Sequence, residues 1–226
     1  MKKKIEPSCH ECSGFCTMGR RNRKKENCLM VIGKKTFQEA IEIYKDNPHL
    51  KEGTKNASIV EAMGYMKWPR LKDTIKYAQL MGYKKLGMAF CIGLIEEAKR
   101  TGELLHKYGF DVCSVCCKAG SLKKTDVDIP EEFTMIAKTG YPIGFTTCNP
   151  AAQALFLNNA KTEMNIIIGL CVGHDITFTN LSDAPVTTLI AKDRSNPHNP
   201  AAILYGSHYS KAFWVEDLKN EKIVNS

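Results

Sequence analysis

The chain has 226 residues, of which 43% are hydrophobic and 25% are charged, and its formal net charge is +8. This composition is ordinary for a globular protein and excludes a largely disordered chain. The longest apolar runs are well short of the roughly 20 residues that a membrane span needs, so we expect a soluble protein with no membrane partner. Residues 1–35 hold ten Lys or Arg and three Glu, whereas the rest of the chain holds 22 basic and 21 acidic residues. The positive charge is therefore concentrated at the amino end.

The ten cysteines make a disulfide framework the first alternative to test. A secreted chain would carry an apolar leader, but Glu6, Pro7 and Cys9 stand where that apolar segment belongs. A chain of this length can also fold around a core without disulfide cross-links. We therefore expect a reducing, cytoplasmic compartment in which the cysteines are thiols or metal ligands.

The first 82 residues divide into two segments of different texture. Residues 1–35 show little hydrophobic periodicity and are rich in Cys, Lys and Arg, so we expect a small module that folds around a metal. Over residues 36–82 apolar residues recur every three or four positions, which predicts three helices packed on the core. Two capping boxes are candidates for helix starts: Thr36 with Glu39, and Ser58 with Glu61.

From residue 83 to the end, short apolar runs alternate with longer amphipathic ones. The expected strands are residues 85–90, 110–115, 164–170 and 186–191, and the expected helices are residues 94–108 and 150–160. Continuous apolar character over residues 164–170 is typical of a parallel strand covered on both faces. Residues 83–226 are thus expected to form an α/β domain with a doubly wound, mostly parallel, Rossmann-like three-layer sheet.

The first cysteine group is Cys9, Cys12, Cys16 and Cys28. Thiolates so close in sequence can surround one soft cation or one cluster, which would supply the folding energy that the module lacks. A close trio with a distant fourth cysteine is nearer to iron–sulfur ligation than to the paired knuckles of zinc sites. We expect a cluster, most simply [4Fe–4S], and keep zinc and unliganded thiols as alternatives.

The basic run Arg20–Lys25 lies inside the loop between the third and fourth of these cysteines. Lys and Arg there would stabilise the net negative charge that four thiolates leave around a divalent ion, or would simply be solvated. An acidic electron-transfer protein is the partner that such a patch would suit. Nucleic acid is disfavoured because no aromatic residues are interleaved with the charges.

The second cysteine group follows the predicted strands. Cys91, the pair Cys116 and Cys117, and Cys171 each lie at the carboxyl end of an expected strand, and these ends form the ligand-binding edge of a parallel sheet. The strand alternation does not decide between Cys116 and Cys117. Cys113, inside its strand, is expected to be a packing residue.

Cys148 reaches the same edge by a different route. It precedes Asn149, a suitable helix N-cap, and Pro150, a suitable first helical residue. A thiol at that position would feel the helix dipole, which favours the thiolate. An enzyme with Cys148 as nucleophile and a histidine base is therefore a further hypothesis.

Two histidines follow later strands. His174 comes soon after Cys171 and is a candidate metal ligand, acid/base group or ordinary loop residue, while His198 is expected in a turn. Neither GxGxxG nor GxxxxGK[ST] occurs, so a nucleotide-dependent oxidoreductase or kinase has little support.

Several of these motifs occur together in one known family. They are Phe90-Cys-Ile-Gly-Leu94, Ser114-Val-Cys-Cys-Lys118, Cys148-Asn-Pro-Ala-Ala-Gln-Ala154, Gly169-Leu-Cys-Val-Gly-His-Asp175, Ala184-Pro-Val-Thr-Thr188, Lys192-Asp-Arg194 and His198-Asn-Pro200. With them, the chain from Cys9 to Tyr205 resembles the prokaryotic family catalogued as domain of unknown function 1847, which is frequent among anaerobes. The resemblance implies metal binding by the cysteine groups and implies no activity. This chain has Leu29 after the fourth cysteine, where relatives commonly have proline.

The leading hypothesis is a redox-related iron–sulfur protein of an anaerobic cytoplasm. One cluster would lie in the amino-terminal module, and a second metal site would use Cys91, Cys117 or Cys116, Cys148 and Cys171, with His174 nearby. The rival is a non-catalytic zinc protein for metal sensing, storage or delivery. No residue points to a substrate, and both the reaction and the oligomeric state stay open.

Overall fold

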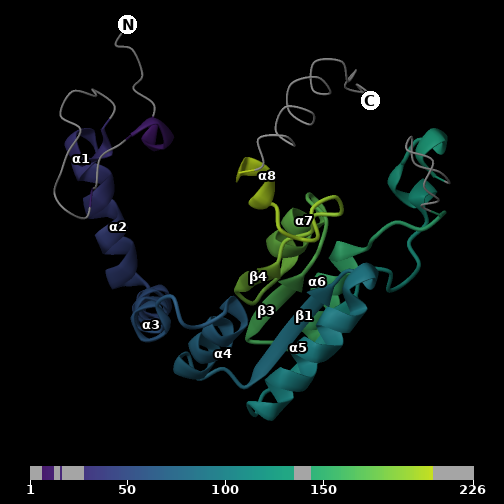
Figure 1. Ribbon diagram of the computed structural model, residues 1–226, viewed down its shortest axis with the longest axis horizontal. Helices are drawn as coiled ribbons and strands as arrows, with labels where there is room; N and C mark the ends of the chain where they lie inside the picture. The colour runs from purple at the N-terminus through teal and green to yellow at the C-terminus, as the bar shows by residue number, and fades with distance from the viewer. Residues whose placement is uncertain (1–6, 13–15, 17–27, 135–143, 206–226) are drawn as a thin grey trace, which may run out of the picture. The chain divides into compact units, whose positions relative to one another are not determined.

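We describe residues 7–12, 16, 28–134 and 144–205 in a computed structural model of the chain (Figure 1). The basic run Arg20–Lys25 lies outside these residues. Contacts within the chain define two units, Met1–Ala62 and Met63–Ser226. Helix α4 (Arg70–Leu80) belongs to the second unit, where it contacts strand β4 (Val186–Ile190).

The first unit contains a short 3-10 turn, η1 (Cys9–Glu11), the helices α1 (Leu29–Ile32) and α2 (Lys34–Asp46), and all but the last two residues of α3 (Pro48–Gly64). With α4, helices α2 and α3 account for the three helices expected over residues 36–82. Both predicted capping boxes are wrong, because α2 and α3 begin earlier and enclose them. The Ser58 hydroxyl instead donates back to the Thr54 carbonyl, at 3.1 Å.

The second unit is built on four parallel strands, which confirms the α/β prediction. The strands are β1 (Lys85–Phe90), β2 (Asp111–Cys116), β3 (Met164–Ile168) and β4. Their order in the sheet is β2-β1-β3-β4, and every pair is parallel. Other elements described here are α5 (Ile95–Lys107), α6 (Pro150–Asn159), α7 (His174–Leu181), α8 (Ala202–Tyr205) and the 3-10 turns Ile92–Leu94, Lys124–Val127 and Glu131–Phe133.

The strand order determines which face of the sheet each connecting helix covers. The chain steps from β1 outward to β2, then crosses back over β1 to β3 and continues in the same direction to β4. Because parallel crossovers are right-handed, α5 must lie on one face and both α6 and α7 on the other. Contacts between α6 and α7 agree with this placement. The winding therefore reverses between β1 and β3, where doubly wound sheets open a crevice at the carboxyl edge.

The core lies on and around the two central strands. All five residues of β3 are buried, and five of the six residues of β1 are buried. Asn165 is a buried polar residue in β3; its Oδ1 accepts from Thr162 and its Nδ2 donates to Ser182, both at 2.8 Å. Gly87 of β1 pairs with Asn165, and a Cβ at Gly87 would overlap the Asn165 amide oxygen.

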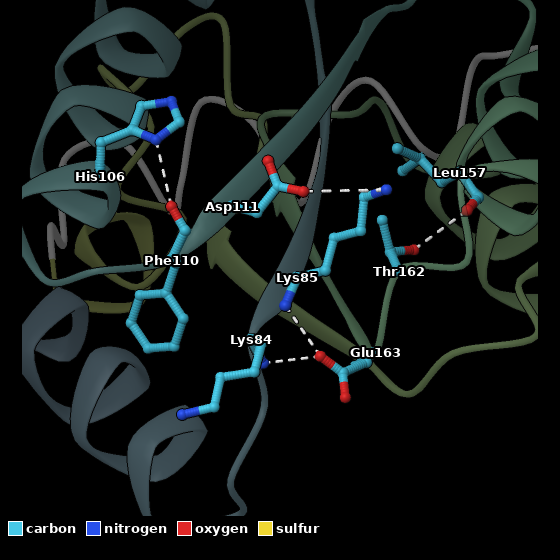
Figure 2. A network of polar contacts seen from close by, with 8 residues as sticks. All are labelled: Lys84, Lys85, His106, Phe110, Asp111, Leu157, Thr162 and Glu163. Carbon is cyan, nitrogen blue, oxygen red and sulfur yellow. Dashed lines mark hydrogen bonds and ion pairs between the residues drawn. The ribbon is translucent and has the colours of Figure 1, made fainter.

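A polar network holds the opposite, amino edge of the sheet (Figure 2). One carboxylate oxygen of Glu163, just before β3, accepts from the backbone amides of Lys84 and Lys85, at 2.6 and 2.8 Å. These two hydrogen bonds lower the pKa of the Glu163 carboxyl. Glu163 thereby ties the start of β3 to the start of β1 through the charged form of its side chain.

Candidate functional site

The backbone places three of the predicted cysteines along one edge. The Cys91 amide donates to the Ile168 carbonyl at 3.0 Å, and the Cys117 amide donates to the Phe90 carbonyl at 2.8 Å. Each residue therefore continues the parallel ladder just beyond its own strand. Cys171 follows the end of β3, and its carbonyl accepts from the first amides of α7. We call this the carboxyl edge.

Cys148 is brought to the carboxyl edge by the start of α6. The Asn149 side chain accepts from the Ala152 amide at 3.0 Å and Pro150 is the first helical residue, which confirms the predicted cap. The Asn149 amide donates to the Cys117 carbonyl at 2.8 Å, which ties the residue after Cys148 to the end of β2. The cap therefore fixes this cysteine against the sheet.

Hydrogen bonding that shifts their pKa values links four cysteine sulfurs in sequence, and we call them the sulfur row: Cys91, Cys117, Cys148 and Cys171. Hydrogen bonding to Cys117 and burial raise the pKa of Cys91 to about 12. Hydrogen bonding to Cys148, followed by burial, raises the pKa of Cys117, although its bond from Cys91 opposes that shift. The directions of these two shifts correspond to a hydrogen bond donated by Cys91 to Cys117 and one donated by Cys117 to Cys148.

Negative charge is most stable at the Cys171 end of the sulfur row. A hydrogen bond from Cys148, with the positive charges of Arg194 and Lys192, lowers the pKa of Cys171 to about 6, against the opposing effect of burial. The sequence predicts an activated thiol at this edge, at Cys148; the thiol whose pKa the structure lowers is Cys171.

Two cations contact opposite ends of the sulfur row. The Lys192 ammonium lies 3.3 Å from the Cys91 sulfur, and a guanidinium nitrogen of Arg194 lies 2.8 Å from the Cys171 sulfur. Both residues follow β4, the one strand whose carboxyl end carries no cysteine. The site thus receives sulfur from three strand ends and a helix start, and positive charge from the fourth strand end.

His174 lies beside the sulfur row as the sequence suggested. Hydrogen bonding to Cys148 raises the pKa of the imidazole, and burial opposes that shift. Its Nδ1 is buried and has no hydrogen-bond partner among the described residues. An unpaired ring nitrogen next to a thiol can serve as a ligand or as a proton carrier.

The structure separates the adjacent cysteines that the strand alternation left unresolved. Cys117 is fully buried and belongs to the sulfur row, and its sulfur also accepts from the Ile92 amide at 3.4 Å. Cys116 ends β2 and packs, half-buried, against the core. Cys113 packs there too, as expected of a structural residue.

The amino-terminal cysteines lie in the other unit. Cys9 and Cys12 are joined through η1 by a backbone hydrogen bond of 3.1 Å, and Cys28 caps the start of α1. Cys9 and Cys16 are exposed, whereas Cys12 and Cys28 are half-buried. All ten cysteines lie among the described residues, and no disulfide joins any of them.

The sulfurs are neighbours without forming a closed metal site. In the described part of the chain, no three Cys, His, Asp or Glu side chains have the arrangement of a metal-binding group. A row of sulfurs linked end to end differs from four ligands surrounding one point.

Among the described helices, none combines the length and apolar character that crossing a bilayer requires.

Fold and site together define a class: a doubly wound α/β protein whose carboxyl edge is lined by cysteine sulfurs and cations. Comparison with known families sharpens this. Residues 28–189 match the model of the family described as protein of unknown function, DUF1847, and the chain belongs to that family. An uncharacterized protein from Methanocaldococcus jannaschii is 47% identical over 174 residues, covering 77% of this chain and 86% of that protein. No solved structure matches the chain.

Sequence reasoning missed the two cations as part of the site. The rule that selected the cysteines also applied to them, because Lys192 and Arg194 directly follow the expected strand 186–191. The signal was therefore present in the sequence.

Proposed function

We propose that this protein binds an iron–sulfur cluster at the sulfur row and serves a redox role. The observation that supports this is the meeting of four cysteine sulfurs, from four separate segments, with two cations at one edge. Four soft thiol donors suit iron–sulfur clusters, and a bound cluster would supply one-electron chemistry. His174 is the adjacent nitrogen donor. Binding would bring the four sulfurs around one point, because in the structure they are linked in sequence and do not surround a common centre.

The same proposal extends to the amino-terminal cysteines. Cys9, Cys12, Cys16 and Cys28 would hold a second cluster, through which electrons would enter from an acidic protein partner. The compartment would be the reducing cytoplasm of an anaerobe, where ten cysteines can remain thiols or metal ligands.

The test is metal and acid-labile sulfide analysis of protein purified without oxygen. We expect brown protein that contains iron and sulfide in similar amounts and bleaches with dithionite. A Cys9→Ser/Cys12→Ser variant should lose one share of the iron, and a Cys148→Ser/Cys171→Ser variant should lose the other. Wild-type protein without iron or sulfide would overturn the proposal.

The adjacent cysteines offer a matched control. Cys117→Ser removes a sulfur of the row, whereas Cys116→Ser changes the neighbouring residue, which packs against the core. Iron at the carboxyl edge should fall in the first variant and stay in the second. Equal loss in both variants would indicate a folding defect rather than ligation.

Other outcomes would support the alternatives. Colourless protein with stoichiometric zinc would favour a non-catalytic zinc protein for sensing, storage or delivery. Metal-free folded protein that is rapidly alkylated at Cys148 would favour an enzyme with that nucleophile and His174 as base.

A further inference from the structure

We propose that the outer surface of helices α6 and α7 is the interface through which two copies of this chain form a dimer. The surface, which we call the α6–α7 face, consists of exposed apolar side chains on the two helices and just before α7: Leu155, Phe156, Val172, Ile176 and Leu181. It contains none of the sulfurs or cations of the carboxyl edge, so its role is separate from the proposed function.

Helix α6 is apolar on both of its sides. Its ten residues include no charged side chain. Ala154 and Leu157 are fully buried in the core, whereas Leu155 and Phe156 are 56% and 59% exposed. A helix that is apolar all round is normally covered on every side. In the described part of the chain, more than half of the surface of Leu155 and Phe156 is left without cover.

Helix α7 continues the apolar surface of α6. The two helices pack against each other, and their ends are tied by two hydrogen bonds. The Asn158 side-chain amide donates to the Leu181 carbonyl at 2.8 Å, and the Asp183 amide donates to Asn158 Oδ1 at 3.0 Å. Ile176 and Leu181 are exposed beside them. The exposed apolar side chains of both helices therefore belong to one surface.

Helix α5 shows how a solvated helix of this protein differs from α6 and α7. Six of the thirteen residues of α5 are charged, and Glu96 and Lys99 form an exposed ion pair at 2.8 Å. Helices α6 and α7 together contain no Lys or Arg and one carboxylate, Asp175, which accepts from the Ile176 amide of its own helix. Depletion of charge and enrichment of large apolar side chains mark the centre of a protein interface.

The size of the α6–α7 face fits one half of a dimer interface. Its five side chains are between 43% and 87% exposed, so at roughly 150–200 Å² for each fully exposed side chain they offer about 450–600 Å² of apolar surface. A standard interface buries about 800 Å² on each partner, of which about 56–65% is apolar. Two such faces therefore suffice for a stable dimer.

The lack of charge favours a second copy over a different protein. The chain carries a net charge of +8, but two α6–α7 faces can meet without placing Lys or Arg side chains opposite one another. The face also offers no ion pairs by which an acidic or basic partner would be selected. An apolar surface is complementary to itself about a two-fold axis, which is the commonest symmetry of protein oligomers.

Helix α2 is the rival apolar surface. Phe37, Ile41 and Tyr44 recur along it and are 42%, 53% and 41% exposed. However, six of its thirteen residues are charged, and the helix carries internal ion pairs, as α5 does. Its composition is therefore that of a solvated helix, and it provides a comparison for the test.

The test measures the mass of the full chain by light scattering after size-exclusion chromatography. Reductant is present, so that no exposed cysteine can link two chains. We expect a particle of twice the 25.3 kDa of one chain. Leu155→Glu and Phe156→Glu each place like charges inside the interface and should weaken the dimer about 100-fold. A monomeric wild type would overturn the proposal.

Two further variants are matched controls. Leu104 of α5 is 38% exposed, and Leu104→Glu adds the same charge on the other side of the sheet. Ile41→Glu adds it on α2. Both variants should remain dimeric, with the circular dichroism of the wild type. Loss of the dimer in Ile41→Glu but not in Phe156→Glu would place the interface on α2 and overturn the proposal.

Hydrogen exchange tests the same interface without any substitution, so it remains decisive if a charged variant fails to fold. Wild-type protein is compared at a concentration where it is dimeric and after dilution to the monomer. Amide exchange should become faster on dilution in α6 and α7 and stay unchanged in α5. A change confined to other segments would overturn the proposal, because the dimer would then form elsewhere.

Discussion

At the scale of single residues, the two edges of the sheet use charge in opposite ways. At the amino edge the Glu163 carboxylate gathers two backbone amides, and at the carboxyl edge two cations approach cysteine sulfurs. The first arrangement neutralises partial charges of the backbone and serves stability. The second places full charges beside reactive groups, which is the usual mark of a functional site.

Glu163 gives a prediction about stability and pH. Glu163→Ala removes the acceptor of two amides and should lower the free energy of unfolding by about 1 kcal/mol. Because folding lowers this pKa, the contribution is complete above the ordinary glutamate value of 4.5 and is lost as pH falls through the lowered value. Urea unfolding of both proteins at several pH values should show the difference shrinking below pH 4.5.

Gly87 gives a prediction about packing. A Cβ there would overlap the Asn165 amide oxygen and lie 3.0 Å from a Leu157 methyl group, in the middle of the two buried strands. Gly87→Ala should therefore destabilise the fold by roughly 3 kcal/mol. Thermal unfolding measures the loss of stability. Surface substitutions ordinarily change stability by no more than about ±0.5 kcal/mol, so a change of that size at Gly87 would contradict its close packing against Asn165.

At the residue scale, some features of the site could be predicted from the sequence and others could not, for physical reasons. The rule of strand ends located Cys91, Cys117 and Cys171, because it depends only on where parallel strands stop. It could not choose Cys117 over Cys116, since alternation no longer applies once the chain leaves the strand. The low pKa of Cys171 could not be anticipated, because it depends on Cys148 and Arg194, which are distant in sequence.

At the scale of elements, helix α6 does most to assemble the site. Its cap holds Cys148 against the end of β2, and its buried Gln153 donates to the carbonyls of Phe90 and Val115, at 3.2 and 2.8 Å. Phe90 is the last residue of β1, and Val115 is the residue before the last in β2. One helix therefore fixes the ends of two strands and a sulfur of the row.

The cap of α6 gives a prediction for this element. Asn149→Ala removes the acceptor for the Ala152 amide and should lower the free energy of unfolding by about 1 kcal/mol, whereas Asn149→Asp should retain the cap. Chemical denaturation compares the three proteins. Equal stability of the alanine and aspartate variants would show that the side chain does not cap the helix.

Element boundaries were predictable where burial determined them. The strands and α6 lie within two residues of their expected limits, since continuous apolar runs and the Asn149-Pro150 pair are strong signals. The helix starts before Thr36 and Ser58 were missed, because a Ser or Thr followed by Glu three residues on also fits the inside of a helix. Gly33 and Pro48 begin those regions instead.

At the scale of the whole molecule, the two units differ in how much of the hydrophobic core they contain. The main hydrophobic core runs from Ile75 to Phe178 and lies entirely within the second unit. The fold of that unit therefore depends on its own residues. Helix α4 contributes Ile75 and Ala78 to this core.

The location of the main core in the second unit predicts how a shortened chain behaves. A chain of residues 63–226 should keep a cooperative thermal transition and the circular dichroism of an α/β fold, since it retains the whole main core. A chain of residues 83–226 lacks α4 and should lose several degrees of melting temperature or fail to fold. Similar melting temperatures for the two would contradict the placement of α4 with the sheet.

The winding reversal between β1 and β3 also makes the sulfur row a gauge of folding. Its four cysteines belong to segments joined by two crossovers, from β1 to β2 and from β2 to β3, so the row exists only when both crossovers have closed. A ligand that binds all four sulfurs stabilises the folded chain, because the unfolded chain does not bring these sulfurs together. Conversely, a chain with one misplaced crossover would present scattered thiols to the cell. Binding at the carboxyl edge would therefore distinguish correctly folded chains from misfolded ones.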